Sequence, residues 1–183
     1  MIGYRFASAV YGQGLRVAVF LFFSLVSTLL VPHFSSASSL KVGDKSPQFE
    51  IQGFNSEKLI GEKNLLLVFY RGHFWSFCQR QLVQLQEYLE KFTQLNTEVI
   101  AVSTDDELKI LKSSRELGVR FRLISDVERR VIGLFDVLHP KQRIARPATF
   151  IIDKRGRIRY RYIGKDYSDR PPIKGIMQVL SWM

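Results

Sequence analysis

The sequence contains a single cysteine, Cys78, among its 183 residues. An internal disulfide needs two cysteines, so this is not a small secreted scaffold held together by disulfides. Internal repeats are missing as well, and the one low-complexity tract is the serine-rich stretch at 35–39. The length suits one domain plus a targeting segment. A thiol without a partner is either buried as a small apolar group or used in chemistry.

Acidic residues are absent from the first 37 residues, which differ sharply from the rest of the chain. Arg5 and Arg16 precede an apolar run at 17–31, and the small residues Ser35 and Ala37 occupy the −3 and −1 positions of a cleavage site. This order predicts a secretory signal peptide over residues 1–37, with an uncleaved membrane anchor through 17–31 as the alternative. In both cases we expect residues 38–183 to be exported to the periplasm or another extracytoplasmic compartment.

Basic residues outnumber acidic ones and give the chain a formal net charge of +10. The first 37 residues contribute two arginines to this value, which leaves +8 on the exported part. An exported protein of this kind is not expected to meet nucleic acid. Anionic surfaces and acidic partners fit the charge better, and an inert basic surface is the simpler alternative.

Apolar runs and amphipathic stretches alternate through the rest of the chain. The pattern predicts strands at 65–70, 98–103, 149–153 and 158–163, and helices at 77–95, 107–117, 127–135 and 172–182, with an extended piece at 121–124. The strand–helix–strand unit at 65–103 predicts parallel strands, and the turn at 154–156 predicts a hairpin. The expected fold class is α/β, with a central mixed β-sheet and helices on both faces, which is the element order of the thioredoxin-like fold.

Cys78 lies where the first of these strands gives way to a helix. Ser76 followed three residues later by Gln79 fits a capping box, which predicts that Ser76 caps the helix and that Cys78 is its second residue. Unpaired backbone N–H groups and the helix dipole favour an anion at this position, and the thiolate is the reactive form of cysteine. Cys78 is therefore the candidate nucleophile.

Three segments resemble, in the same order, the peroxiredoxin-like redoxins of the alkyl hydroperoxide reductase/thiol-specific antioxidant family. They are the entry segment 42–49, the stretch from Val68 to Leu82, and the segment 146–153 with Pro147 before a strand. The middle segment is similar to the FYRG-x-W-C-P-F-C active site of one subgroup. The resemblance implies an antioxidant oxidoreductase without a cofactor, in which Cys78 reduces a hydroperoxide and an external thiol recycles it. The resemblance leaves open whether the protein forms a homodimer.

The chain departs from the family pattern three residues before the reactive cysteine. Typical members have threonine there, and the subgroup has a second cysteine, whereas this chain has Trp75, whose indole donates one N–H. A C-x-x-C disulfide exchange is thereby excluded. Two other hypotheses remain open: a catalytically degenerate redoxin module that binds a partner, and a thiol that captures another protein as a mixed disulfide. An accessible Cys78 with an arginine nearby favours catalysis, and a Cys78 covered by Trp75 or Phe74 favours a degenerate site.

Two arginines are candidates to support the thiol. Arg71 follows the first strand and Arg146 precedes the later one, and these segments meet near the active site in the fold that the chain resembles. A guanidinium there would stabilise a thiolate and hold the oxygens of a peroxide. The candidate walls of a substrate pocket are Trp75, Phe74, Ser76 and Pro147.

Polar residues beside these positions have simpler explanations. Asp105 and Asp106 precede the helix predicted at 107–117, where carboxylates cap the helix and offset its dipole. No histidine or cysteine cluster accompanies them in the sequence, so we expect no metal site. His73 follows Arg71 in the same loop and is either a proton carrier or merely exposed.

Overall fold

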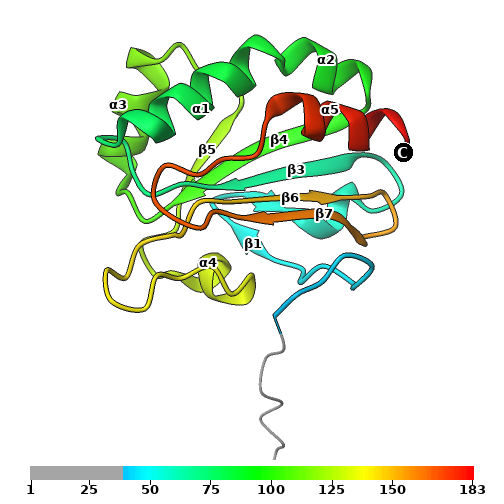
Figure 1. The fold of residues 1–183 in the computed structure, drawn as a ribbon, viewed down its shortest axis with the longest axis horizontal. Coiled ribbons are helices and arrows are strands. Elements are labelled where there is room, and N and C mark those ends of the chain that lie inside the picture. Colours follow the sequence, from blue (N-terminus) through cyan, green and yellow to red (C-terminus); the bar gives the residue numbers. More distant parts are fainter. Residues whose placement is uncertain (1–38) are drawn as a thin grey trace, which may run out of the picture. The chain divides into compact units, whose positions relative to one another are not determined.

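The computed structural model describes residues 39–183 (Figure 1). The signal peptide or anchor predicted at 1–37 lies outside the described residues. Among residues 39–183, no helix combines the length and apolar character needed to cross a membrane.

Five strands form one mixed sheet in the order β5-β4-β3-β6-β7. Strands β3, β4 and β5 are parallel, whereas β6 is antiparallel to both of its neighbours, β3 and β7. The predicted parallel strand–helix–strand unit and the predicted hairpin are therefore confirmed. The strands are β3 (Asn64–Phe69), β4 (Thr97–Ser103), β5 (Arg122–Ser125), β6 (Ala148–Ile152) and β7 (Ile158–Ile163). A separate small hairpin, β1 (Glu50–Ile51) and β2 (Phe54–Asn55), precedes a short 3-10 helix at Ser56–Leu59.

Side chains alternate along β3 and divide the core into two layers. Leu65, Leu67 and Phe69 pack on one side with the β1–β2 hairpin and with α4 (Arg130–Leu134). Leu66 and Val68 pack on the other side with α1 (Ser76–Glu87), α2 (Leu89–Gln94) and α5 (Ile173–Ser181), and α3 (Glu107–Glu116) also covers this side. Figure 1 shows α4 on the opposite side of the sheet from the other helices. The prediction of a mixed sheet with helices on both faces is confirmed.

The helix after β3 is interrupted, contrary to the single helix predicted at 77–95. The N–H of Tyr88 donates to the carbonyl of Leu85 at 3.2 Å, three residues back, and this tighter turn ends α1 before α2 begins. Leu82, Leu85 and Phe92 are nevertheless all buried and Leu89 is partly buried, so α1 and α2 together still present one apolar face to the core.

The helix predicted at 127–135 is also shorter than expected. Arg129 has the left-handed conformation, with φ of 59°, and α4 therefore begins at Arg130. The carboxylate of Asp126 accepts the N–H groups of Arg130 and Ile132, both at 2.9 Å, and satisfies donors at this helix start.

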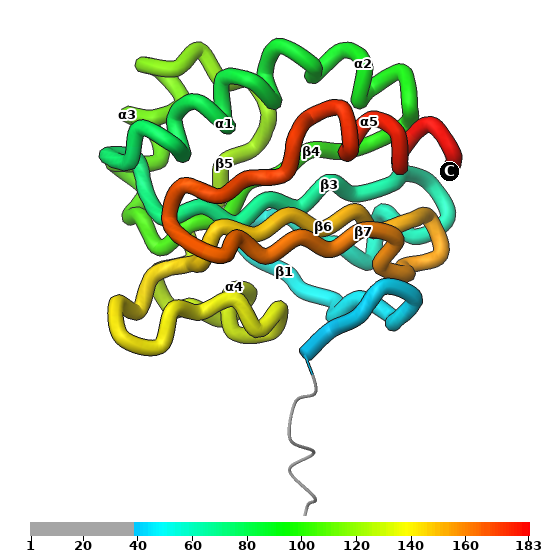
Figure 2. The backbone as a smooth tube through the Cα atoms, viewed as in Figure 1, coloured from blue at the N-terminus to red at the C-terminus, as the bar shows by residue number. Residues whose placement is uncertain are grey.

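The segment 164–172 connects β7 to α5 and contributes to the candidate site described below. Figure 2 traces it from the end of β7 past α1 and into α5. It brings residues from near the C-terminus against the first turn of α1, although nearly a hundred positions separate them in the chain.

Candidate active site

Cys78 is the third residue of α1, and its side chain is fully buried. The residue that precedes the helix is Trp75, whose carbonyl accepts the N–H groups of Cys78 at 2.8 Å and Gln79 at 3.0 Å. No side chain within residues 39–183 caps this helix start, because Ser76 already lies in the first turn and is exposed. The predicted capping box is therefore wrong, and with it the placement of Cys78 as second residue. The Gln79 amide donates to the carbonyl of His73 instead.

Arg170 contacts the sulfur. Its Nη2 donates to Sγ of Cys78 at 3.3 Å, and its Nε donates to Oε1 of Gln81 at 2.7 Å. Nη1 donates to the carbonyls of Tyr167 at 3.1 Å and Asp169 at 2.9 Å. All three guanidinium nitrogens are engaged, so Arg170 is held in one orientation with a charged donor on the thiol.

Sequence reasoning missed Arg170. The residue lies 92 positions from Cys78, in a connection between two elements, and no motif marks it. Pro171 and Pro172 follow it, and they stiffen the backbone beyond it. That stiffness is the one signal in the sequence, and it does not reveal which element the arginine meets.

Arg71 lies against Trp75, with its Cζ 4.2 Å from the centre of the indole ring. The side chain is buried, at 5% exposure, and its Nη2 donates to Oε1 of Gln142 at 2.8 Å. Burial lowers the pKa of Arg71, the charge of Cys78 opposes this effect, and the second guanidinium, Arg170, adds to the lowering. Arg71 thus contacts Trp75 and Gln142, and it forms no hydrogen bond with Cys78, so its role at the thiol stays a prediction.

Trp75 belongs to a stack of aromatic rings beside the thiol. The centres of the Phe74 and Tyr167 rings lie 5.3 and 5.8 Å from that of Trp75, and Tyr167 also contacts Phe77. Trp75 packs on the core cluster that contains Cys78, and Phe74 is 64% exposed. Trp75 therefore packs on this part of the core, as Tyr88 and Tyr160 also do, whereas Phe74 is largely exposed.

Two depressions flank the site, and Cys78 lines neither. One has a volume of about 690 Å³, and its wall includes Arg71, Trp75, Arg146, Pro147 and Tyr167. The other has a volume of about 610 Å³, and its wall includes Ser76, Phe77, Gln81 and Arg170. We call them the tryptophan cavity and the serine cavity.

The predicted pocket residues divide between these depressions. Trp75 and Pro147 line the tryptophan cavity, Ser76 lines the serine cavity, and Phe74 lines neither. Arg146 lies in the wall of the tryptophan cavity and forms no hydrogen bond with Cys78. The arginine on the thiol is Arg170, which reaches it from the chain segment before α5.

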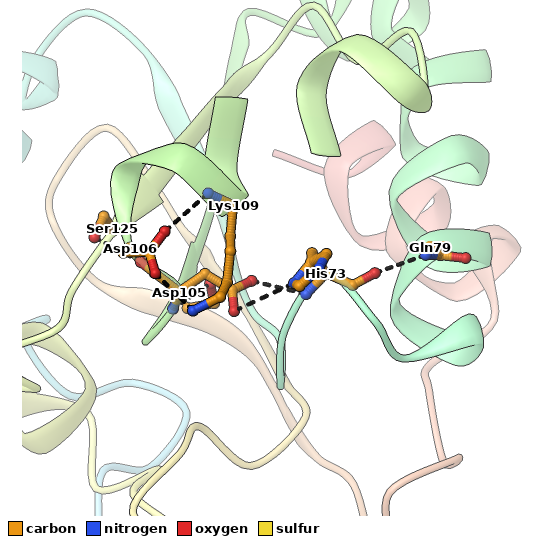
Figure 3. A network of polar contacts seen from close by, with 7 residues as sticks. His73, Gln79, Asp105, Asp106, Lys109 and Ser125 are labelled. Carbon is orange, nitrogen blue, oxygen red and sulfur yellow. Dashed lines mark hydrogen bonds and ion pairs between the residues drawn. The ribbon is translucent and has the colours of Figure 1, made fainter. Parts of the chain in front are cut away.

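The loop that carries Arg71 and Trp75 is anchored at His73 (Figure 3). The N–H of His73 donates to Oδ2 of Asp105 at 2.7 Å, and its carbonyl accepts from Gln79 at 2.6 Å. His73 thereby links the segment after β4 to the first turn of α1. Gly72 has φ of +155°, and a Cβ there would lie 3.0 Å from Oδ1 of Asp105. The close approach of loop and carboxylate therefore requires glycine at this position.

The acidic pair after β4 has two separate roles. Asp106 caps α3 as predicted, because its Oδ1 accepts the N–H of Lys109 at 2.9 Å. Asp105 is buried and holds the His73 loop, and Ser125 donates to its carbonyl at 2.6 Å. The His73 ring lies beside Asp105, with Nδ1 3.9 Å from Oδ1, and not on the thiol. The described residues contain no group of three or more potential metal ligands.

Burial of Asp105 makes stability depend on pH. Burial raises the pKa of Asp105 above its ordinary 3.8, although the hydrogen bond from His73 opposes the shift. The folded state therefore holds this proton more tightly than the unfolded chain, so the free energy of unfolding falls as pH rises from 3.8 through the folded pKa. Asp105→Asn keeps an acceptor for the His73 N–H and cannot ionise.

We expect the stability of Asp105→Asn relative to wild type to improve as pH rises from about 4 to about 7, by on the order of 1 kcal/mol or less once solvent screening is allowed for. Urea unfolding of both proteins across this range measures the difference. A difference that stays constant with pH would contradict the assigned direction.

The fold and the site together define a class of protein. A mixed sheet whose central strand leads through a short loop to a helix with a thiol in its first turn is the architecture of thioredoxin-fold thiol proteins. The model of the AhpC/TSA family matches residues 42–161, which is most of the part that the structure describes. The chain therefore belongs to the AhpC/TSA family, the peroxiredoxins, as its sequence motifs implied.

Individual relatives agree with this family. The chain is 34% identical over 134 residues to the chloroplastic 2-Cys peroxiredoxin BAS1 of Hordeum vulgare, a match that covers 65% of this chain and 64% of that protein. It is 36% identical to the protein of the same name from Arabidopsis thaliana, covering 65% of this chain and 50% of that one. The chain thus spans about half to two thirds of these relatives. Their names specify two cysteines, and this chain has one.

Solved structures confirm the fold. The peroxidoxin BcpB of Mycobacterium tuberculosis matches with a TM-score of 0.70 at 19% identity, covering 79% of this chain and 98% of that one. The reduced 2-Cys peroxiredoxin of Plasmodium vivax matches with a TM-score of 0.68 at 22% identity, covering 76% and 80%. The predicted thioredoxin-like fold class is thereby confirmed.

Proposed function

We propose that this protein is a one-cysteine thiol peroxidase, in which Cys78 reduces a hydroperoxide and an external thiol restores it. The contact between the guanidinium of Arg170 and Sγ of Cys78 carries the proposal. A fixed positive donor on a buried sulfur stabilises the thiolate, which is the nucleophile that attacks a peroxide. Family membership supports the same activity.

The reaction has two stages. The Cys78 thiolate attacks the terminal oxygen of the hydroperoxide, the O–O bond breaks, and the alkoxide leaves as an alcohol after taking a proton. Cys78 is then a sulfenic acid. One external thiol condenses with it to a mixed disulfide and water, and a second external thiol releases Cys78 and forms the external disulfide. The second stage must use external thiols because the chain has no other cysteine.

The charges around the sulfur fit the first stage. Arg170 contacts Sγ directly, and Arg71 lies on the ring of Trp75, the residue that precedes α1. Both can bind peroxide oxygens and stabilise the negative charge that develops on the leaving oxygen. In this proposal the two guanidinium groups supply the polar contacts that Trp75, with one N–H, cannot.

One observation favours a second candidate function. Cys78 is fully buried, and Trp75 packs over the cluster that contains it. Burial of this kind suits a redoxin-fold module that has lost catalysis and binds a partner. For the peroxidase, it means that the first turn of α1 or the Trp75 side chain must move before a peroxide reaches the sulfur.

A direct measurement of Cys78 oxidation separates the two candidates. The full chain is exposed to stoichiometric peroxide, and the sulfenic acid is followed by dimedone labelling and mass spectrometry. The matched control is the same protein unfolded in urea, where Cys78 reacts as a free thiol. We expect the folded protein to be oxidised at least about 100-fold faster than the unfolded one, because the folded site supplies the two guanidinium groups.

Folded protein that reacts no faster than the unfolded control would overturn the peroxidase proposal and leave the binding module. The Cys78→Ser variant must show no dimedone adduct, since it has no thiol. Addition of dithiothreitol after oxidation should return the free thiol, which tests the recycling stage separately.

A further inference from the structure

We propose that the tryptophan cavity binds the carboxylate end of an organic anion, so that the preferred hydroperoxides carry a carboxylate. The binding site stands on the cavity alone, and its role in substrate choice rests on the proposed peroxidase function. The cavity has a volume of about 690 Å³, which suits a ligand much larger than hydrogen peroxide.

The wall of the cavity carries unbalanced positive charge. Arg71, Arg146 and Lys165 line it, together with one carboxylate, Asp166. The ion pairs of residues 39–183 include neither Arg146 nor Lys165. A bound anion would therefore meet Arg146 and Lys165 without displacing an ion pair of the described chain.

The single carboxylate in the wall is occupied by its own turn. Oδ1 of Asp166 accepts the N–H of Ser168 at 2.7 Å, the hydroxyl of Ser168 at 2.7 Å and the N–H of Asp169 at 3.0 Å. These hydrogen bonds lower the pKa of Asp166 and keep its carboxylate ionised. All of them come from residues of the same 166–169 turn and not from the cations of the wall.

Two buried donors in the wall lack acceptors. Nε of Arg71 and Nε1 of Trp75 are buried without a hydrogen-bond partner in the part of the chain that the structure describes. Both atoms are buried, and the Arg71 side chain is itself 95% buried, so a ligand in the cavity pairs with them only after the Arg71 or Trp75 side chain shifts. An acceptor would then recover the free energy that an unpaired buried donor costs. Oxygens of a carboxylate are acceptors only, and they suit a guanidinium and an indole N–H.

Much of the rest of the wall is apolar or aromatic. Trp75, Pro140, Pro147 and Tyr167 suit a hydrocarbon chain, and the remaining wall residues are His139, Gln142 and Gly164. The cavity thus combines cationic and apolar surface, the chemistry of a carboxylate on an alkyl body. Arg71 and Trp75 are the wall residues that also neighbour Cys78, so a ligand held here lies beside the reactive end of the site.

The binding test uses Trp75 as a reporter and needs no peroxide. The chain has two tryptophans, and Trp182→Phe in the full chain leaves Trp75 as the sole tryptophan, which is excited selectively at a wavelength that tyrosine does not absorb. Octanoate is titrated against this protein, with octanamide as the neutral control of equal length. We expect octanoate to change Trp75 fluorescence saturably, with octanamide binding at least about 10-fold more weakly because it lacks the charge.

Matched variants locate the anion. Arg146→Gln should weaken octanoate binding about 10-fold, whereas Arg80→Gln, in the wall of the serine cavity, should leave it unchanged. Equal binding of octanoate and octanamide, an unchanged affinity in Arg146→Gln, or the absence of saturable binding would each overturn the site.

A second readout separates this inference from the proposed function. Dimedone labelling of Cys78 is compared between a carboxylate-bearing alkyl hydroperoxide and its methyl ester. The inference predicts at least about 10-fold faster labelling with the carboxylate. If octanoate binds and neither hydroperoxide accelerates labelling, the anion site stands and the peroxidase function fails. If both hydroperoxides react equally fast, the peroxidase stands and the substrate preference is overturned.

Discussion

Replacing Arg170 by glutamine should slow the oxidation of Cys78 by hydroperoxide about 10- to 100-fold. A hydrogen bond to a charged group is worth about 1.5–3 kcal/mol, and a factor of ten in rate corresponds to about 1.4 kcal/mol. Glutamine retains a donor but loses the positive charge that lies 3.3 Å from Sγ. Dimedone labelling at several peroxide concentrations gives the second-order rate constant that tests this expectation.

Two variants distinguish the charge of Arg170 from its structural contacts. Arg80→Gln removes an exposed arginine of α1 that stacks on Phe77 and does not contact the sulfur, so it should leave the rate within about twofold of wild type. Arg170→Lys keeps the charge without the fork that binds Gln81, and we expect an intermediate rate. Equal rates for Arg170→Gln and wild type would show that Arg170 does not activate the thiol. Urea unfolding of each variant checks that the fold persists.

Replacing Trp75 by threonine should raise the rate of Cys78 alkylation by iodoacetamide at least about 10-fold. Cys78 is fully buried, and Trp75 is a half-buried aromatic residue that packs on its cluster and directly precedes α1, so we expect the smaller side chain to open a path to the sulfur. The change also removes the ring on which Arg71 stacks and should cost on the order of 2 kcal/mol of stability. Alkylation is followed by mass spectrometry in conditions where the protein remains folded.

Phe74→Thr is the matched control, because Phe74 is the neighbouring aromatic residue but is 64% exposed and lines neither cavity. It should change the alkylation rate little. An unchanged rate in Trp75→Thr would mean that movement of the α1 helix itself controls access. A rise in alkylation without a rise in peroxide oxidation would show that the indole contributes to activating the peroxide as well as covering the thiol.

Local patterns in the sequence were enough to predict the sheet. The apolar run at 65–70, the run at 98–103 and the turn at 154–156 each have one strong interpretation, and β3, β4 and the β6–β7 hairpin follow them within a residue or so. Helix ends were less predictable because they depend on single hydrogen bonds. The break at Tyr88 and the start of α4 at Arg130 come from one such bond and one left-handed residue.

The part of the site that comes from neighbouring residues in the sequence was also predictable. Cys78, Arg71 and Trp75 lie within eight positions of one another, so one strand-to-helix junction places all three. Arg170 reaches the sulfur through a long connection whose path depends on tertiary packing, and no pattern of spacing reveals that. The capping box failed because Ser76 and Gln79 have the right separation but lie one position too late relative to the helix start.

The close approach of Gly72 to Asp105 restricts which residues can replace either one, although the two positions are far apart in the sequence. A side chain at 72 would meet the carboxylate that holds the loop, and a shorter residue at 105 would release His73. A side chain at 72, or a residue without a carboxylate or amide oxygen at 105, would therefore move Arg71 and Trp75. In descendants of this sequence we expect position 72 to remain glycine and position 105 to accept only residues that keep this oxygen.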